Sequence, residues 1–363
     1  MGRRAVVAVM ALVLAVLAAA CGGTDPVDDG TEAATPTATT DPSTGEATDA
    51  TDRPSFAERL ALLPPVGEDQ AQVVLGDLDR AAALAGVTAP SDPADEAAIP
   101  YLLAISGGPT ADGDPSQVVI PLPTTAHPER AAQIAEFAAE VGWSAIDLDW
   151  YAEVSAPPAV TMVAGGDVTP DDLTAAIGEP DDDLWAVGGG EPFAPSLEDT
   201  TPARPIGEPL WLTLADGVLG VARSPESLDA LRGGGASAAD DEGLLALAEL
   251  ADDRECLGAH IALGPGDPVM WCPLSQAEPA RTALLAARLA DEASAAAEVA
   301  RVAEVLTGSA SQSGQPYVEL FSSTDVSQDE RLVVLELEIA ADRPADLPLR
   351  MLFLRDPAVP GGG

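Results

Sequence analysis

The chain has 363 residues, with 60 acidic against 17 basic side chains and a formal net charge of −43. A surface this negative repels phosphate, which excludes nucleic acid as a partner and disfavours electrostatic binding to anionic lipid headgroups. All the basic residues are arginine, and aromatic residues make up only 4% of the chain, so we expect an aliphatic core.

The first 21 residues follow the pattern of an export signal. Two arginines precede an uncharged apolar run at 5–20, and small residues lead directly into Cys21. The run is short for a membrane-spanning helix, which needs about 20 residues, and suits a signal peptide. The pattern resembles the bacterial lipoprotein signal, the lipobox, with Ala18 where that signal most often has leucine. The resemblance implies removal of signal peptide 1–20 and attachment of diacylglycerol to Cys21, with the lipid bilayer as the partner of this anchor.

Two alternatives remain open for this segment. The first is an ordinary signal peptide cut at a small-residue site, with Cys21 incidental, and the second is a single uncleaved membrane anchor. The pair Arg3 and Arg4 also resembles the start of a twin-arginine signal, so the sequence leaves the export route open.

Residues 21–54 form a linker rich in Thr, Pro and Asp. Val27 is its only large aliphatic side chain, so the segment buries too little apolar area to offset the entropy of an ordered chain. We therefore expect a disordered, extended linker between the lipidated Cys21 and a folded body. Its threonines are either bare or carry O-linked sugars.

Residues 55–155 predict a mainly helical first part of the folded body. A strand at 72–78 runs into a helix at 79–85, which Gly86 ends. Residues 118–120 are a short strand or an extended connector. Apolar periodicity and capping residues predict further helices at 54–63, 99–105 and 128–141, and a short one that begins at Ser144 and carries Tyr151.

Residues 156–357 predict an α+β part with an internal duplication. In its first unit, a helix begins at the capping residue Thr169 and a hairpin turns at Asp216 and Gly217. The expected strands of this unit are 160–164, 184–187, 210–214 and 219–222. The second unit has a strand at 283–289, a helix at 294–306 and strands at 317–321 and 332–339. Each unit is read as strand–helix–strand–strand.

One segment decides whether this duplication holds. Because alanine favours helix so strongly, 281–307 is alternatively one continuous helix, which would remove the second unit. Between the units we expect a helix at 242–251 and a hairpin of 257–263 with 268–272. The predicted fold class is thus α+β, with antiparallel sheets that carry helices on one face and two repeats after a more helical N-terminal part.

Cys256 and Cys272 flank the second hairpin, and we expect them to form a disulfide. Cysteines of exported proteins pair in oxidising compartments, and a loop of about 17 residues gains roughly 3 kcal/mol from closure. A metal site needs more ligands than these cysteines and His260 supply, and a redox pair favours a C-x-x-C spacing. We expect neither a metal nor a cofactor.

An aromatic cluster, Trp143, Trp150 and Tyr151, is the candidate ligand or partner surface. Its alternative role is to fill a small helical core in a chain that has few aromatic residues. The acidic runs 112–114, 181–183 and 240–242 lack the ligand spacing of an EF-hand, and we interpret them as solvated loop charge. Neither His127 nor His260 lies near a nucleophile motif, so no catalytic residue is assigned.

The opening of the body, with Leu62-Leu63-Pro64-Pro65 and then Gly76-Asp77-Leu78-Asp79, resembles uncharacterised actinobacterial cell-surface lipoproteins. That resemblance carries no activity and no catalytic residue. The sequence therefore predicts a lipid-anchored protein on the extracytoplasmic face of the cell membrane. Its body is expected to be a non-enzymatic module that binds a ligand or an envelope protein. The alternatives are a carrier of a small or lipidic ligand held between sheet and helices, and an unrecognised hydrolase.

Overall fold

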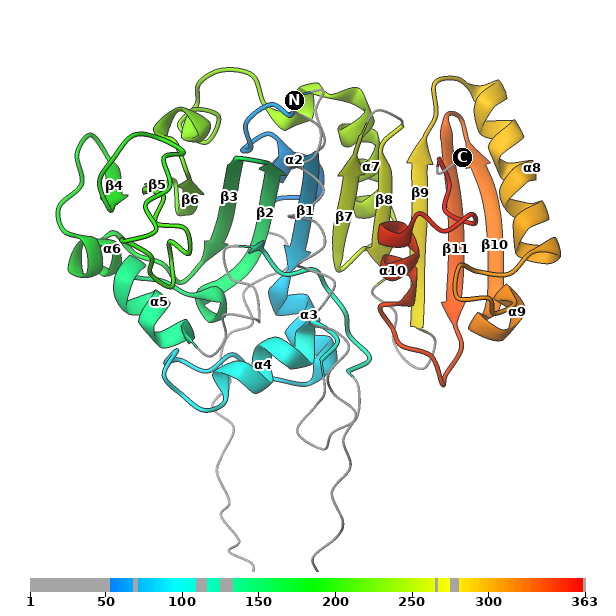
Figure 1. The fold of residues 1–363 in the computed structure, drawn as a ribbon, viewed down its shortest axis with the longest axis horizontal. Helices are drawn as coiled ribbons and strands as arrows, with labels where there is room; N and C mark the ends of the chain where they lie inside the picture. The colour runs from blue at the N-terminus through cyan, green and yellow to red at the C-terminus, as the bar shows by residue number, and fades with distance from the viewer. Residues whose placement is uncertain are drawn as a thin grey trace, which may run out of the picture. The chain divides into compact units, whose positions relative to one another are not determined.

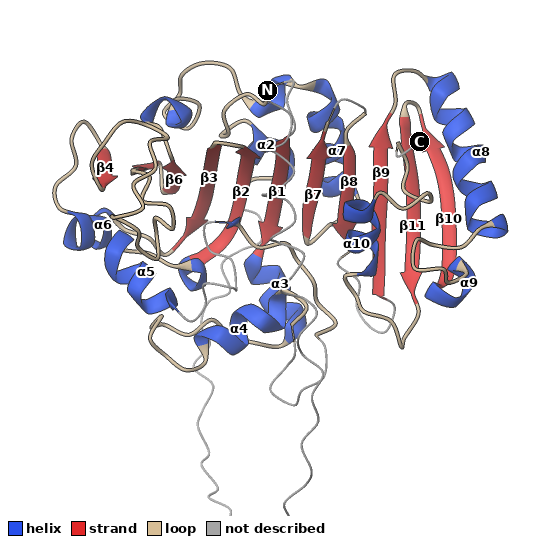
Figure 2. Ribbon diagram, viewed as in Figure 1, coloured by secondary structure: helices blue, strands red, loops and turns tan. Residues whose placement is uncertain are grey.

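One sheet of eleven strands, with every neighbouring pair antiparallel, runs through the folded unit (Figures 1 and 2). The computed structural model describes residues 53–67, 71–108, 116–124, 133–264, 267–274 and 281–361. The expected signal peptide, Cys21 and all but the end of the linker lie outside these residues. The predicted α+β class with an antiparallel sheet is confirmed.

Helices and strands are interspersed along the chain. The strands are β1 (Ala71–Asp77), β2 (Leu148–Ala156), β3 (Ala159–Gly166), β4 (Leu184–Val187), β5 (Leu210–Ala215), β6 (Val218–Ala222), β7 (Gly258–Leu263), β8 (Val269–Pro273), β9 (Arg281–Arg288), β10 (Phe321–Asp329) and β11 (Leu332–Ile339). The α-helices are α2 (Phe56–Leu60), α3 (Leu78–Ala85), α4 (Ala98–Ile105), α5 (Ile134–Val141), α6 (Pro170–Ile177), α7 (Glu242–Asp253), α8 (Glu292–Gly308), α9 (Tyr317–Leu320) and α10 (Leu347–Leu354).

The order of the strands shows a similar topology in the two halves of the sheet. From its centre the sheet reads β1-β2-β3-β6-β5-β4 in one direction and β7-β8-β9-β11-β10 in the other. In each half the first three strands are neighbours in the sheet, a helix (α6 or α8) follows the third, and a later hairpin pairs its second strand with that third strand. In the first half, α3, α4 and α5 lie between β1 and β2. The two strand–helix–strand–strand units expected from the sequence are the outer parts of these halves, and β4 is an addition to one of them.

The two halves meet at an antiparallel pair of first strands, β1 and β7, in which Val74 lies opposite His260. A helix precedes each of these strands, and the two helices, α2 and α7, pack against each other. The carboxylate of Asp252 on α7 accepts hydrogen bonds from the first backbone N–H groups of α2, at Phe56 (2.8 Å) and Ala57 (3.1 Å). A residue of the second half thus caps the helix that opens the first half.

Helices cover both faces of the sheet, which corrects the expectation of helices on one face. The central strands are apolar on both sides, so each face needs a covering layer. One face is covered by α2 and α7, whose Leu60 and Leu247 pack with Leu75 of β1. The opposite face is covered in the first half by α3 to α6 and in the second by α8 to α10.

Several local signals produce the elements that they predict. Asp216 and Gly217 take φ values of 50° and 79° in the turn between β5 and β6, which is the left-handed conformation that the Asp-Gly pair favours. The side chain of Thr169 accepts a hydrogen bond from the backbone N–H of Asp172 and caps α6. Segment 281–307 is a strand followed by a helix, β9 and α8, and not one continuous helix.

Two predicted elements are wrong. Tyr151 lies on β2, and only Ala145–Asp147 before that strand is a short 3-10 helix. Because β2 pairs on both edges and is apolar on both faces, its apolar spacing does not distinguish it from a helix. Residues 317–320 form α9, and the strand is the mostly polar β10 that follows. The domain boundary expected near residue 155 falls within β2, and β1 and β2 of the supposedly helical part lie at the centre of the sheet.

Candidate functional site

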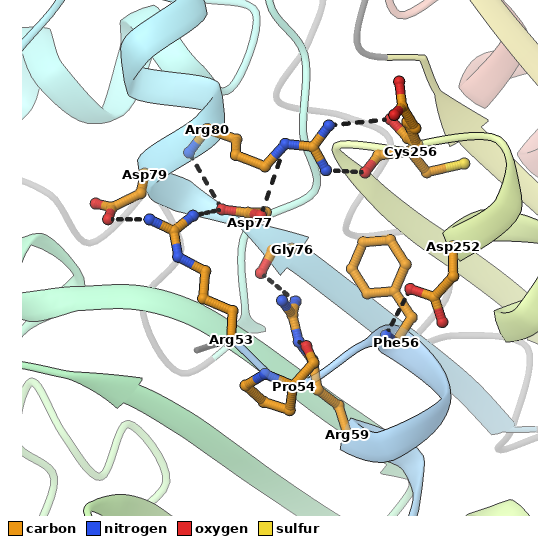
Figure 3. A network of polar contacts seen from close by, with 11 residues as sticks. Arg53, Pro54, Phe56, Arg59, Gly76, Asp77, Asp79, Arg80, Asp252 and Cys256 are labelled. Atoms are coloured by element: carbon orange, nitrogen blue, oxygen red, sulfur yellow. Dashed lines mark hydrogen bonds and ion pairs between the residues drawn. The ribbon is translucent and has the colours of Figure 1, made fainter. Parts of the chain in front are cut away.

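Arg53, the first described residue, is held by two carboxylates beside the central strand β1 (Figure 3). Its Nη1 lies 2.7 Å from Oδ1 of Asp77, and its Nη2 lies 2.6 Å from Oδ2 of Asp79. Asp77 ends β1 and caps α3, where its side chain accepts a hydrogen bond from the backbone N–H of Arg80 at 3.1 Å. The pair therefore fastens the start of the folded unit to the point where strand β1 becomes helix α3.

A second arginine of this network connects α3 to the other half of the sheet. The guanidinium of Arg80 lies 3.9 Å from Asp77 and donates to the backbone carbonyls of Cys256 at 3.3 Å and Glu255 at 3.4 Å (Figure 3). These two residues lie between α7 and β7. The network thus joins the first strand of one half to the segment that leads into the first strand of the other.

A third arginine, Arg59 on α2, is buried. Its Nη1 donates to the carbonyl of Gly76 at 3.0 Å, and its Nε donates to the carbonyl of Pro54 at 2.9 Å. The guanidinium lies over the rings of Phe56 and Trp150, 4.8 and 5.0 Å from their centroids. Burial lowers the pKa of Arg59 to about 10, against the charges of Asp77 and Asp252, so the group stays charged at neutral pH.

Asp79 and Asp149, from α3 and β2, are hydrogen-bonded to each other through their carboxyl groups. Burial and the negative charge of Asp79 raise the pKa of Asp149 to about 6, which Arg53 partly opposes. Burial likewise raises the pKa of Asp79. Two interacting carboxyls of this kind titrate as a pair.

The chemistry available to this network is proton uptake and ion pairing. Its three arginines bond to carboxylates and backbone carbonyls, and its carboxyl pair faces Arg53 and the charge of Asp167. Among the described residues, no group of three or more His, Cys, Asp or Glu side chains is arranged to hold a metal ion. The network is therefore a device for attaching one segment of chain to another.

The predicted aromatic surface is wrong. Trp143, Trp150 and Tyr151 are 1%, 6% and 0% exposed, and they do not form one cluster. Trp143 packs edge-to-face on Phe137 and shares a core with Tyr151, whereas Trp150 points to the opposite face of the sheet. Adjacent residues of a strand point to opposite faces, so Trp150 and Tyr151 could share a surface only on a helix. Their alternative role, core packing, is the one that the structure shows.

Cys256 and Cys272, the predicted disulfide pair, are brought together. Both are buried, and their Cα atoms are 5.8 Å apart, which is within the range of a disulfide. Cys256 lies two residues before β7 and Cys272 lies within β8, and both belong to the core beneath α7.

The remaining candidate residues that the structure describes have packing or helix-capping roles. His260 is buried in β7 with its ring 4.9 Å from that of Phe353, and burial lowers its pKa to about 4. In the acidic run 240–242, Asp240 completes a capping box with Ser237, and Asp241 caps α7. His127 and the run 112–114 lie outside the described residues.

The sequence interpretation missed the roles of Arg53, Asp149 and Asp252. Part of this network could have been found in the sequence. Asp77 and Asp79 lie where β1 ends and α3 begins, a position that favours capping carboxylates. Their cationic partner is 24 residues away from Asp77 in the sequence, and Asp252 is 196 residues away from the helix end that it caps. Only the folded arrangement of the two halves brings these groups together.

Within the part of the chain that the structure describes, no helix has the length and apolar character needed to span a bilayer. Comparison with protein-family models, with curated proteins and with solved structures finds no match to this chain.

Proposed function

We propose that this chain is an exported lipoprotein. Its anchor is a lipid on Cys21, and its folded unit is a non-enzymatic module that binds a ligand or an envelope protein on the extracytoplasmic side of the membrane. The observation that carries this proposal is the distribution of its three cysteines. Cys256 and Cys272 lie at disulfide distance inside the folded unit, and Cys21 ends the apolar N-terminal run.

Disulfides persist in oxidising compartments outside the cytosol, so the pair supports export independently of the N-terminal pattern. A lipid on Cys21 accounts for the third cysteine, which would otherwise be an unpaired thiol in an exported chain. Two or more acyl chains anchor a protein stably without help from its surface. An anchor of this kind suits a chain with a formal net charge of −43, which anionic headgroups repel.

The contacts around Arg53 support a passive, mechanical role for the start of the folded unit. The linker continues directly into Arg53, and this residue is tied to Asp77 and Asp79 beside the central strand. Pull on the linker would be transmitted to the middle of the sheet and not to a terminal helix that frays easily. This arrangement is the one expected of a module held at the end of a tether.

Two clefts among the described residues have the size of a small ligand. One cleft, beside Arg204 and Arg223, has a volume of about 60 Å³, and another, beside Arg288 and Arg331, has a volume of about 210 Å³. Pockets for drug-sized ligands measure roughly 300–1,000 Å³. We therefore propose that the protein binds a compact, polar molecule, in preference to the alternative that it carries a lipid.

Metabolic labelling with a palmitate analogue tests the anchor. We expect label on the wild-type protein in the membrane fraction, and no label on Cys21→Ala, which should accumulate outside that fraction. Cys272→Ala is the matched control, because it removes a cysteine of the folded unit and should be labelled like the wild type. Equal labelling of the wild type and Cys21→Ala would refute the anchor. Native mass spectrometry of the membrane-extracted protein then tests for a bound ligand or subunit.

A further inference from the structure

The larger of these two clefts lies at one end of the second half of the sheet. It is bounded by the ends of β7 and β9, by the starts of β8 and β11, and by the first turn of α7. Its volume of about 210 Å³ lies between that of a cavity of roughly 150 Å³, which accommodates benzene, and that of a drug-sized pocket. A ligand of six to about ten non-hydrogen atoms would fill it.

The cleft brings together Arg288 and Arg331, whose guanidinium groups keep donors with no partner among the described residues. Arg288 donates through one Nη to Glu242 at 3.0 Å, and Arg331 donates through Nε to the carbonyl of Leu289 at 3.0 Å. Among the described residues, no hydrogen bond or ion pair engages the two terminal nitrogens of Arg331. Such a fork matches the two oxygens of a carboxylate.

The cleft is also lined by two carboxylates, Asp241 and Asp267, which differ in their hydrogen bonding. Asp241 is occupied, because its Oδ1 accepts from the backbone N–H groups of Gly243 at 2.7 Å and Leu244 at 3.0 Å, so the helix end itself offers no free anion site. Asp267 is only partly exposed and makes no hydrogen bond with the described residues. Burial and the charge of Glu298 raise its pKa, and Arg331 lowers it. A desolvated carboxylate of this kind is stabilised by a second cation.

The net charge of the whole protein favours zwitterionic ligands over anionic ones among molecules that carry a carboxylate. A formal net charge of −43 opposes the approach of any anion, whereas a zwitterion carries no net charge and meets no such barrier. Phosphate or a simple carboxylate would engage Arg331 and would bring no second cation to Asp267. Only a molecule with both an acid and an amine satisfies the free fork of Arg331 and the carboxylate of Asp267 together.

We propose that this cleft binds a free α-amino acid. The carboxylate of the ligand pairs with Arg331 and Arg288, and its ammonium group pairs with Asp267. The inference rests on the ligand-binding part of the proposed function and names the class of ligand. It does not depend on the lipid anchor, which is measured separately at Cys21.

Ligand-detected NMR on the full mature chain, extracted in detergent, tests this assignment. The probes are L-alanine, acetate, methylammonium and inorganic phosphate, each titrated to saturation. We expect L-alanine to bind at least about tenfold more tightly than any other probe, which corresponds to about 1.4 kcal/mol. Arg331→Gln should weaken L-alanine and acetate by a similar factor. Asp267→Asn should weaken L-alanine and methylammonium, and it should leave acetate unchanged or bound more tightly.

Arg350→Gln is the matched control, because Arg350 is an exposed arginine whose one ion-pair partner among the described residues is Asp346, just before α10. It should bind L-alanine like the wild type, and thermal unfolding should show that all variants are folded. Absence of saturable L-alanine binding to the wild type would overturn the inference. Tighter binding of phosphate or acetate than of L-alanine, with no effect of Asp267→Asn, would overturn it in favour of a plain anion site. If L-alanine binds but Cys21 carries no lipid, the anchor fails and the cleft assignment stands.

Discussion

The guanidinium of Arg53 lies 2.7 Å from the carboxylate of Asp77, whose side chain is only 6% exposed. This contact attaches the first described residue to the end of β1. A second cation, Arg80, lies farther from Asp77, at 3.9 Å. A buried carboxylate that loses its nearest partner keeps its desolvation penalty, so the pair matters more than an exposed one.

Arg53→Gln should lower the free energy of unfolding by about 1–3 kcal/mol. Arg350→Gln removes an ion pair between Arg350, whose side chain is 59% exposed, and Asp346, the residue before α10, and should change the free energy of unfolding by less than about 0.5 kcal/mol. Urea unfolding of both variants and the wild type at pH 7 measures the difference. Equal midpoints for the two variants would show that the contact of Arg53 with Asp77 does not hold the start of the unit.

The carboxyl pair of Asp79 and Asp149 predicts an unusual dependence of stability on pH. The folded pKa of Asp149 is about 6, above its ordinary value of 3.8, so the folded state keeps a proton that the unfolded state has released. The contribution of Asp149 to stability is therefore greatest below pH 4, and it is lost as the pH rises from about 4 to about 6.

Asp149→Asn removes this titration and keeps a donor for the hydrogen bond to Asp79. The variant should be more stable than the wild type at pH 7, by about 1 kcal/mol after allowance for the partial exposure of the site. The advantage should disappear near pH 4. Thermal unfolding of both proteins across this pH range is the measurement, and a variant that is less stable than the wild type at pH 7 would contradict the prediction.

Gly76 permits the ring of Tyr151 to cross the central strand. The two residues are cross-strand partners in β1 and β2, and a Cβ built on Gly76 would overlap Cε1 of the ring and lie 3.0 Å from its Cζ. Gly76→Ala should therefore destabilise the fold by about 1–3 kcal/mol, the usual effect of overpacking. Gly189→Ala is the matched control, since nothing lies within 4 Å of its Cβ position. Chemical denaturation in which both variants behave alike would contradict the core role of Tyr151.

Reduction of the cysteine pair should weaken the core beneath α7. The loop between Cys256 and Cys272 has a sequence separation of 16, for which the chain-entropy model gives about 3 kcal/mol. Cys256→Ala with Cys272→Ala should lose roughly that amount, and added reductant should destabilise the wild type but not the double variant. Alkylation without reductant, followed by mass measurement, is the direct check, and free thiols in the exported protein would disprove the cross-link.

Elements with a local physical cause were predictable from the sequence. The turn at Asp216 and Gly217, the cap at Thr169 and the end of α3 at Gly86 each depend on a conformation or a hydrogen bond within a few residues. For 281–307 the sequence left two alternatives, a strand followed by a helix or one continuous helix, and the structure shows the first, β9 and α8. Asp291, which caps α8, stops the strand and starts the helix.

Features that depend on distant pairing were not predictable. Apolar spacing placed Tyr151 on a helix, because a strand buried on both faces lacks the alternation that identifies strands. The polar strand β10 was not predicted, because its sequence has few apolar residues. It is the last strand of the sheet among the described residues, and an edge strand needs little apolar surface. The network of Arg53 and the cleft of Arg331 combine segments from several elements, and no sequence spacing encodes them.

The mass of the mature N-terminus tests the account most directly. The protein is to be purified from its own membrane and its N-terminal peptide identified by mass spectrometry. We predict that residues 1–20 are absent and that the peptide begins at Cys21 with diacylglycerol on its sulfur. A peptide that retains Met1, or one that begins elsewhere with an unmodified Cys21, would contradict the account.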